Sequence, residues 1–193
     1  MYNEWCMRYL RKRSLARSVL RGLGIAGLVL IAASNPYFGL NLIKGFRYRD
    51  KKDWAKFYRS LKSLQGRGLV KFIDNGHTGI TAQITLKGKE TIRQIEIDEL
   101  QIENKEIDGK WRLVIFDVPV KKNKNRLAFR EKIKNMGFIM VQKSVWASPY
   151  ECYKEIIVLR KFYEIEKYVT YLEASDIEDE LIWRGKFNLK NQT

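Results

Sequence analysis

The chain has 193 residues, of which 45% are hydrophobic and 12% aromatic, and it carries 37 basic against 22 acidic residues. This apolar content excludes a disordered chain, and the length allows one large domain or two small ones. The net charge of +15 favours a polyanionic partner, either nucleic acid or an anionic membrane surface. Residues 1–72 hold 16 basic and 3 acidic residues, so polyanion binding is expected in the N-terminal part.

The cysteines and the histidine give no pattern of a metal or nucleophile site. Cys6 and Cys152 lie far apart and form no CxxC or Cys/His set, which argues against structural zinc and against a disulfide framework. His77 is the single histidine and falls in a loop pattern without an acidic partner. We therefore expect no cofactor.

The first predicted elements are a basic helix over residues 3–20 and an apolar helix that continues through Ala33. The apolar run Gly22–Pro36 follows several arginines and in this respect resembles a signal peptide. It is shorter than the about 20 residues that a bilayer span requires. We interpret it as a buried helix that proline ends, which predicts a cytoplasmic protein without a membrane segment. A short helix is predicted near residues 37–44.

The stretch "DKKDWAKFYRSLKSL" (Asp50–Leu64) has the clearest helical pattern in the chain. Its large apolar residues recur at intervals of three and four and therefore share one face. They are Trp54, Phe57, Tyr58, Leu61 and Leu64. The opposite face is basic and polar, and it comprises Lys52, Lys56, Arg59 and Ser63, widened by Lys51 and Lys62.

Two β-rich runs within Leu69–Leu86 flank the turn-rich loop 74–79, which predicts a hairpin. Three helices followed by a hairpin are typical of a winged helix-turn-helix, in which the last helix enters the major groove and the wing lies along the backbone. A charged face is often only solvated surface, but every charged residue on this one is a cation. The predicted DNA-binding residues are Lys51, Lys52, Lys56, Arg59, Lys62, Ser63, Arg67, Lys71, His77 and Thr78.

The polar stretch Asp98–Lys110 ends in an Asp-Gly turn signal and divides the chain. We predict a winged-helix domain over 1–100, a linker over 101–110 and a second domain over 111–193. The second domain is predicted as strand 112–116, a helix from 121 that Gly137 ends, an extended segment 138–149 with a polar break, helix 151–165, strand 167–175 and an edge strand 181–187. The expected fold class is α+β, a winged helix-turn-helix followed by a ferredoxin-like βαββαβ domain.

The segments "LVIFDVP" and "GFIMVQKSVWASP", with the basic helix between them, resemble the central domain of the PaaX family of bacterial repressors. That domain is similar to the small subunit of CRISPR adaptation complexes. One strand of that subunit has a sequence pattern that is matched here by Gln142, Ser144, Val145 and Trp146. In the N-terminal part, "RSLKSLQGRGLV" and the expected wing strand "ITLKGKE" are also similar to this family. Classical members continue into a third domain, which we expect to be absent, and binding of a small-molecule effector stays open.

Asp117 ends the apolar run of "WRLVIFDVP" and has two interpretations. In the CRISPR subunit, two such aspartates face each other near the symmetry axis, so the resemblance implies a Mg²⁺ site for phosphodiester cleavage. One carboxylate per chain is a weak site for such an ion. The favoured interpretation is structural, with Asp117 capping the strand end or the following helix and pairing with Arg112, Lys121 or Arg126.

The sequence therefore predicts a homodimeric DNA-binding repressor rather than an enzyme. The ferredoxin-like domain is expected to pair two chains, with aromatics such as Trp146 and Tyr153 on the pairing surface. Two winged helices would then read half-sites about one helical turn apart, or a multiple of it. The alternatives are a Mg²⁺-dependent nuclease acting through Asp117 and an architectural subunit of a CRISPR adaptation complex.

Overall fold

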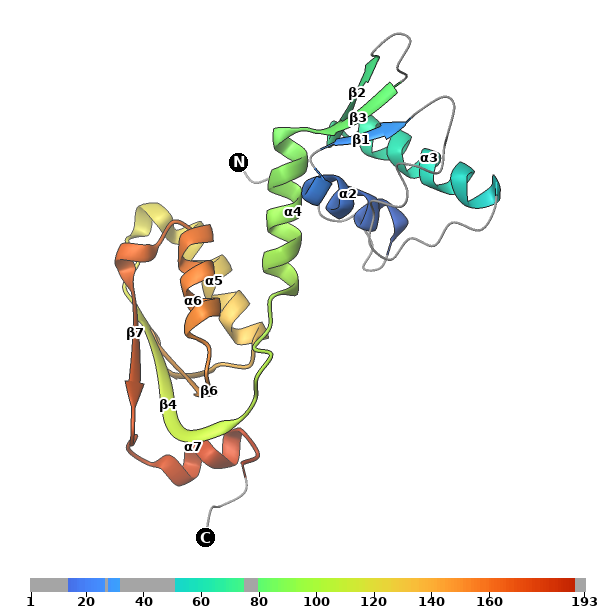
Figure 1. Cartoon of the computed structure of the whole chain (residues 1–193). Helices are drawn as coiled ribbons and strands as arrows, with labels where there is room; N and C mark the ends of the chain where they lie inside the picture. The colour runs from blue at the N-terminus through green and yellow to red at the C-terminus, as the bar shows by residue number, and fades with distance from the viewer. Residues whose placement is uncertain (1–13, 27, 32–50, 75–79, 190–193) are drawn as a thin grey trace. The chain divides into compact units, whose positions relative to one another are not determined.

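The computed structural model describes residues 14–26, 28–31, 51–74 and 80–189. The chain divides into two compact units, Met1–Glu96 and Ile97–Thr193 (Figure 1). The boundary falls just before the predicted end of the first domain. Ile102, in the predicted linker, is only 4% exposed because it packs into the core of the second unit.

The described part of the first unit combines helices with a three-stranded antiparallel sheet of order β1-β3-β2. Its elements are α2 (Leu15–Ala26), β1 (Leu28–Ile31), α3 (Lys51–Gly66), β2 (Val70–Asp74), β3 (Ile80–Ile84) and α4 (Leu86–Glu99), which continues into the second unit. The core joins Leu20 of α2, Phe57 and Leu61 of α3, and Ala82 of β3, all at most 1% exposed. The helix predicted over 50–64 and the hairpin after it are confirmed.

The apolar run after α2 differs from its prediction as a helix through Ala33. Helix α2 ends at Ala26, and Leu28–Ile31 forms a strand that pairs with β3, Leu28 opposite Gln83. Two of its four residues are β-branched and favour extended structure. A two-stranded hairpin also leaves an open edge whose backbone groups a third strand can satisfy. The helices predicted over 3–13 and 37–44 lie outside the described residues.

Helix α4 also differs from the prediction, which extends the wing strand through residues 86–90. The strand ends at Ile84 instead. The hydroxyl of Thr85 then accepts a hydrogen bond from the Gly88 N–H at 3.0 Å, the arrangement of a helix N-cap. Ile95 packs into the first core and Ile97 into the second, so the apolar residues of α4 serve both units.

The second unit contains a four-stranded antiparallel sheet of order β5-β6-β4-β7. Its elements are β4 (Ile107–Phe116), α5 (Asn123–Asn135), β5 (Ile139–Gln142), β6 (Val145–Tyr150), α6 (Tyr153–Phe162), β7 (Val169–Ala174) and α7 (Glu180–Lys186). Both α5 and α6 cover the same face of the sheet (Figure 1). The sequence βαββαβ with this strand order fits a ferredoxin-like fold, as predicted.

The predicted edge strand over 181–187 is wrong, because these residues form helix α7. The backbone carbonyl of Asp179 accepts the N–H of Ile182 at 2.8 Å, which starts the helical turn. An ion pair from Arg184 to Glu180, at 3.3 Å and one turn apart, adds to it. Among the described residues, no helix has the length and apolar character that crossing a bilayer requires.

Candidate nucleic-acid interface

Helix α3 is amphipathic in the predicted sense. Phe57, Leu61 and Leu64 are at most 1% exposed and pack into the first core. The side chains on the other side reach solvent, and those described there are Lys56, Arg59, Lys62 and Ser63. Lys51 and Lys52 lie in the first turn of α3, where the side chains are outside the described part. The spacing of about 100° per residue thus places the cations of this helix on its solvent side.

Two of these cations are held in place by neighbouring groups. The Nε of Arg59 donates to the carbonyl of Ala55 at 3.1 Å, which directs the guanidinium along the helix. The Nζ of Lys62 lies 5.3 Å from the ring centre of Phe72 and 5.8 Å from that of Tyr58. These two rings stack at 6.5 Å. Since Tyr58 belongs to α3 and Phe72 to β2, Lys62 lies where these two elements pack together.

The hairpin after α3 alternates between core and solvent. Val70, Ala82 and Ile84 are buried in the core, whereas Lys71 is exposed on the other face, opposite Gln83. Arg67, in the turn between α3 and β2, is half-buried. The predicted wing-tip residues His77 and Thr78 lie outside the described residues. The cations of α3 are therefore followed at once in the chain by Arg67 and Lys71.

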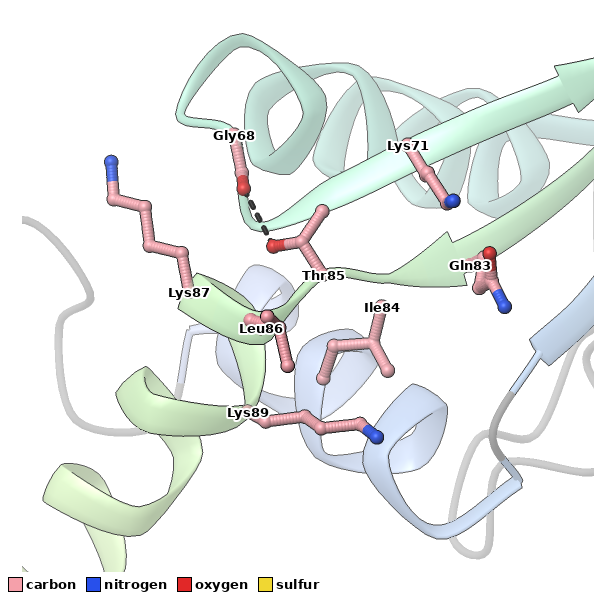
Figure 2. A pocket seen from close by; sticks show the side chains of 8 residues that line it. All are labelled: Gly68, Lys71, Gln83, Ile84, Thr85, Leu86, Lys87 and Lys89. Atoms are coloured by element: carbon pink, nitrogen blue, oxygen red, sulfur yellow. Dashed lines mark hydrogen bonds between the residues drawn. The ribbon is translucent and has the colours of Figure 1, made fainter.

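A basic pocket lies at the start of β2, the end of β3 and the start of α4, and Figure 2 shows its lining. Its volume is about 450 Å³. The lining residues are Gly68, Lys71, Gln83, Ile84, Thr85, Leu86, Lys87 and Lys89. Lys87 and Lys89 are absent from the predicted site, because the sequence pattern places them on a wing strand. Only the N-cap pattern of a threonine three residues before Gly88 could have signalled the helix that carries them.

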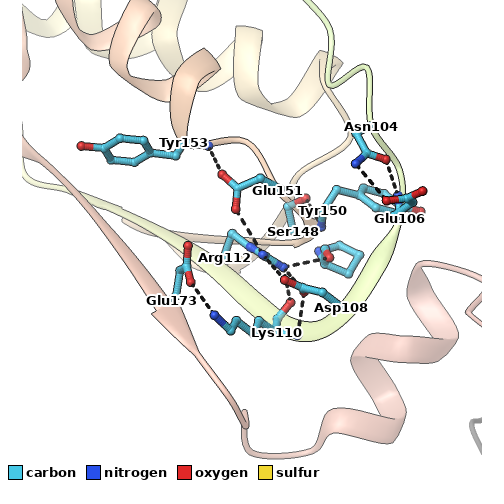
Figure 3. Close-up of polar contacts among 11 residues, drawn as sticks. Asn104, Glu106, Asp108, Lys110, Arg112, Ser148, Tyr150, Glu151, Tyr153 and Glu173 are labelled. Atoms are coloured by element: carbon cyan, nitrogen blue, oxygen red, sulfur yellow. Dashed lines mark hydrogen bonds and ion pairs between the residues drawn. The ribbon is translucent and has the colours of Figure 1, made fainter.

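Asp117 stands exposed at the end of β4. Its backbone N–H donates to the carbonyl of Tyr168 at 3.0 Å. The predicted pairing with Arg112 is wrong, since that guanidinium binds Asp108 and Glu151 (Figure 3). Within the described residues, Asp117 forms no ion pair with Lys121 or Arg126 either. The same part of the chain holds no group of three or more His, Cys, Asp or Glu side chains that could bind a metal ion.

Arg112 is buried, with 2% of its side chain exposed, and it ties the start of β4 to the end of β6. Its two terminal nitrogens each donate to one carboxylate oxygen of Asp108 at 2.5 Å, and one also donates to Glu151 at 3.2 Å. The carbonyls of Lys110 and Pro149 accept further bonds (Figure 3). We call Arg112, Asp108 and Glu151 the arginine clamp. It lies where the β4–β6 register shifts between Ile107 and Arg112.

The hydrogen bonds between Arg112 and Asp108 shift the pKa values of both residues. The hydrogen bond from Arg112 holds the pKa of Asp108 well below its usual value, and the same bond raises the pKa of Arg112. Next to the clamp, burial raises the pKa of the Cys152 thiol to about 12. The thiol is therefore protonated at neutral pH, which makes it a poor nucleophile.

The face of the second sheet away from α5 and α6 is apolar. Alternate residues point to it, and Leu172, 44% exposed, lies opposite the half-buried Leu113. Ile115 and Val145 pair across β4 and β6 and are also half-buried. We call these four residues the open apolar face.

The two aromatic residues predicted to line a pairing surface do not lie on this face. Trp146 is 3% exposed and packs under the helices, so that part of the prediction is wrong. Tyr153, at the start of α6, is 50% exposed. Its ring meets that of Tyr171 edge-on at 5.3 Å.

Residues 104–182 match the family model described as the PaaX protein central Cas2-like domain. The matched segment contains β4 through β7 and thus the whole sheet of the second unit. No curated protein matches the chain. The chain is therefore an α+β protein whose second unit is similar to the PaaX central Cas2-like domain.

Proposed function

We propose that this protein is a DNA-binding transcription regulator that acts as a homodimeric repressor. Its first unit is a winged helix-turn-helix in which α3 enters the major groove and the β2–β3 hairpin is the wing. The observation that carries the proposal is the exposed cationic side of α3, directly followed by the hairpin. The similarity of residues 104–182 to a PaaX central domain adds a regulatory context.

The geometry of α3 suits duplex DNA for a physical reason. Phe57 and Leu61 anchor the helix in the core. Its opposite side can therefore enter a DNA groove while the unit stays folded. Lysine and arginine side chains there would contact phosphates, which set affinity and register. Arg59 and Ser63 lie one turn apart on this side and are the candidates for contacts with base edges.

In this proposal, the second unit forms the homodimer. The open apolar face leaves Leu172 44% exposed and its neighbours half-buried, and a second copy would remove this surface from water at a gain of about 25 cal/mol per Å². A two-fold dimer presents two identical first units and so predicts a pseudo-palindromic operator. Its half-sites would be spaced by about one helical turn or a multiple of it.

The alternative is a Mg²⁺-dependent nuclease or an architectural subunit of a CRISPR adaptation complex. The exposed carboxylate of Asp117 at a strand end is the observation in its favour, together with the Cas2-like match. Asp117 would then supply one Mg²⁺ ligand per chain, with the second carboxylate coming from a partner copy.

Binding to the DNA upstream of the gene tests the proposal. Reversing the charge at Lys56 and Arg59 to glutamate should weaken duplex binding by about a hundredfold, because attraction to phosphates becomes repulsion. The control is Lys143→Glu, which reverses the charge of one exposed lysine in the β5–β6 turn. This variant should bind as the wild type does. Equal binding by all three proteins would refute the proposal.

The same assay separates the nuclease alternative. Asp117→Ala should bind DNA with unchanged affinity if the protein is a regulator. Incubation of the wild type with supercoiled DNA and Mg²⁺ should leave the DNA intact. Cleavage that requires Mg²⁺ and disappears in Asp117→Ala would favour the nuclease instead.

A further inference from the structure

The floor of the basic pocket in the first unit is closely packed and hydrogen-bonded. The Thr85 hydroxyl donates to the carbonyl of Gly68 at 2.7 Å and accepts from the Gly88 N–H at 3.0 Å. A side chain on Gly88 would place its Cβ 2.2 Å from the carbonyl oxygen of Leu69. Only glycine permits this approach, so the first turn of α4 lies directly on the turn that follows α3.

This packing brings the residues that carry the pocket's polar side chains close together. Lys71 and Gln83 are cross-strand partners on β2 and β3 and therefore lie on the same face of the sheet. Lys89 comes from the first turn of α4. Figure 2 shows these three side chains extending to one side of the pocket, while Lys87 extends to the other. Lys87 donates from Nζ to the carbonyl of Arg67 at 2.9 Å.

The chemistry of the lining selects one kind of ligand. Three of the eight lining residues are lysines and none is acidic. The Gln83 amide adds a neutral donor. A lysine ammonium group binds phosphate as a point charge, and this interaction does not depend on which base is attached. A pocket of this composition therefore attracts a phosphate group, and it does so independently of sequence.

We propose that this pocket is a second contact to the DNA backbone, in which Lys71, Lys89 and Gln83 bind a phosphodiester group of the duplex held by α3. The inference rests on the proposed function and extends it to the first turn of α4. Continuity in the chain favours DNA as the source of the phosphate. Gly68 lines the pocket, and α3 ends at Gly66.

The test measures binding of the full chain to fluorescent duplexes by anisotropy over a series of NaCl concentrations. Lys71→Gln/Lys89→Gln should weaken binding to upstream and random duplexes alike, by roughly tenfold at low salt. The slope of log K against log salt should fall in magnitude by about 0.9 for each phosphate that the variant no longer neutralises. Both lysines are exposed, so thermal melting should be unchanged.

Lys87→Gln is the matched control, because it removes the same charge from the same helix turn on the other side of the pocket. It should change the affinity and the slope less than the pocket variant does. Equal effects of Lys87→Gln and a single Lys89→Gln would mean that net charge alone matters, and the inference would be wrong. An unchanged slope in the double variant would also overturn the inference. A pocket that binds only free phosphate would give this result, because it would make no contact with the duplex.

Lys56→Gln/Arg59→Gln distinguishes this inference from the proposed function. If these α3 changes weaken binding and the pocket changes do not, only the second contact is refuted. If the wild type shows no salt-dependent duplex binding, or the α3 changes have no effect, the proposed function itself fails. Weakening in both variants supports both.

Discussion

The two units each build a sheet with one face against a core, but their other faces differ in chemistry. In the first unit that face carries Lys71 and Gln83, and the solvent side of α3 is also cationic. In the second unit it carries Leu113, Ile115 and Leu172. A polar cationic face stays hydrated until a polyanion approaches. An apolar face is unfavourable in water and is satisfied by another protein surface.

The units also differ in how they use arginine. Arg59 of α3 is exposed to solvent and therefore accessible to a ligand. Arg112 of β4 is buried and bound by the carboxylates of Asp108 and Glu151. Under the proposed function, the same type of side chain serves recognition in one unit, whereas it serves internal structure in the other. Removing each should affect different measurements, which gives a direct way to test the division of labour.

The largest expected effect is on the stability of the second unit. Arg112→Met removes the arginine clamp and leaves Asp108 and Glu151 without their partner. Both carboxylates are about half exposed, so we expect a loss of about 2–3 kcal/mol, below the 3–5 kcal/mol typical of a fully buried pair. Urea unfolding followed by tryptophan fluorescence measures this, because Trp111 and Trp146 lie in the same unit.

Lys110→Met is the control for the arginine clamp. Lys110 pairs with Glu173 at 3.2 Å at the surface, and such pairs contribute about 0–1 kcal/mol. Neither variant should change DNA affinity in the absence of urea. A large loss of DNA binding in Arg112→Met at a temperature where it is folded would show that the two units do not divide their roles as described.

The next effect concerns the open apolar face. Leu172→Asp should weaken a homodimer by at least about tenfold, because it would bury a carboxylate against the apolar residues of the partner copy. The weight-average mass in sedimentation equilibrium measures this. Val158→Asp is the matched control, since Val158 is 46% exposed on α6 and Leu172 44% exposed on β7. Equal dissociation by both, or a monomeric wild type, would remove the open apolar face as the dimer interface.

The sequence predicts those features that depend on local periodicity. The spacing of Phe57, Leu61 and Leu64 identifies α3 and its exposed cations, and the order of strands and helices identifies the ferredoxin-like unit. The strand Leu28–Ile31 is not predicted, because an uninterrupted apolar run has the same pattern in a buried helix and a strand. Its conformation is decided by pairing with β3, which lies distant in sequence.

The two sites that the sequence does not predict depend on contacts between distant segments. Lys89 joins Lys71 in the basic pocket only because Gly88 allows α4 to lie on Leu69. The Asp-Gly pair at 108–109 has the pattern of a linker turn. In the structure it belongs to β4, and Gly109 has a φ of +78°, a conformation that favours glycine. This bend brings Asp108 to Arg112.

The smallest expected effect is the response of the second unit to acid. Because Arg112 lowers the pKa of Asp108 in the folded state, the unfolded chain takes up the proton at a higher pH, near the usual value of about 3.9. The clamp therefore contributes stability above that pH, and the contribution is lost as the pH falls toward the lower folded pKa. Asp108→Asn should lose less stability between pH 6 and pH 3 than the wild type does, as measured by urea midpoints. In the Arg112→Met background the same substitution should leave this pH dependence unchanged, because the lowered pKa depends on the guanidinium. If Asp108→Asn alters the pH dependence equally in both backgrounds, the acid response arises from groups other than this pair.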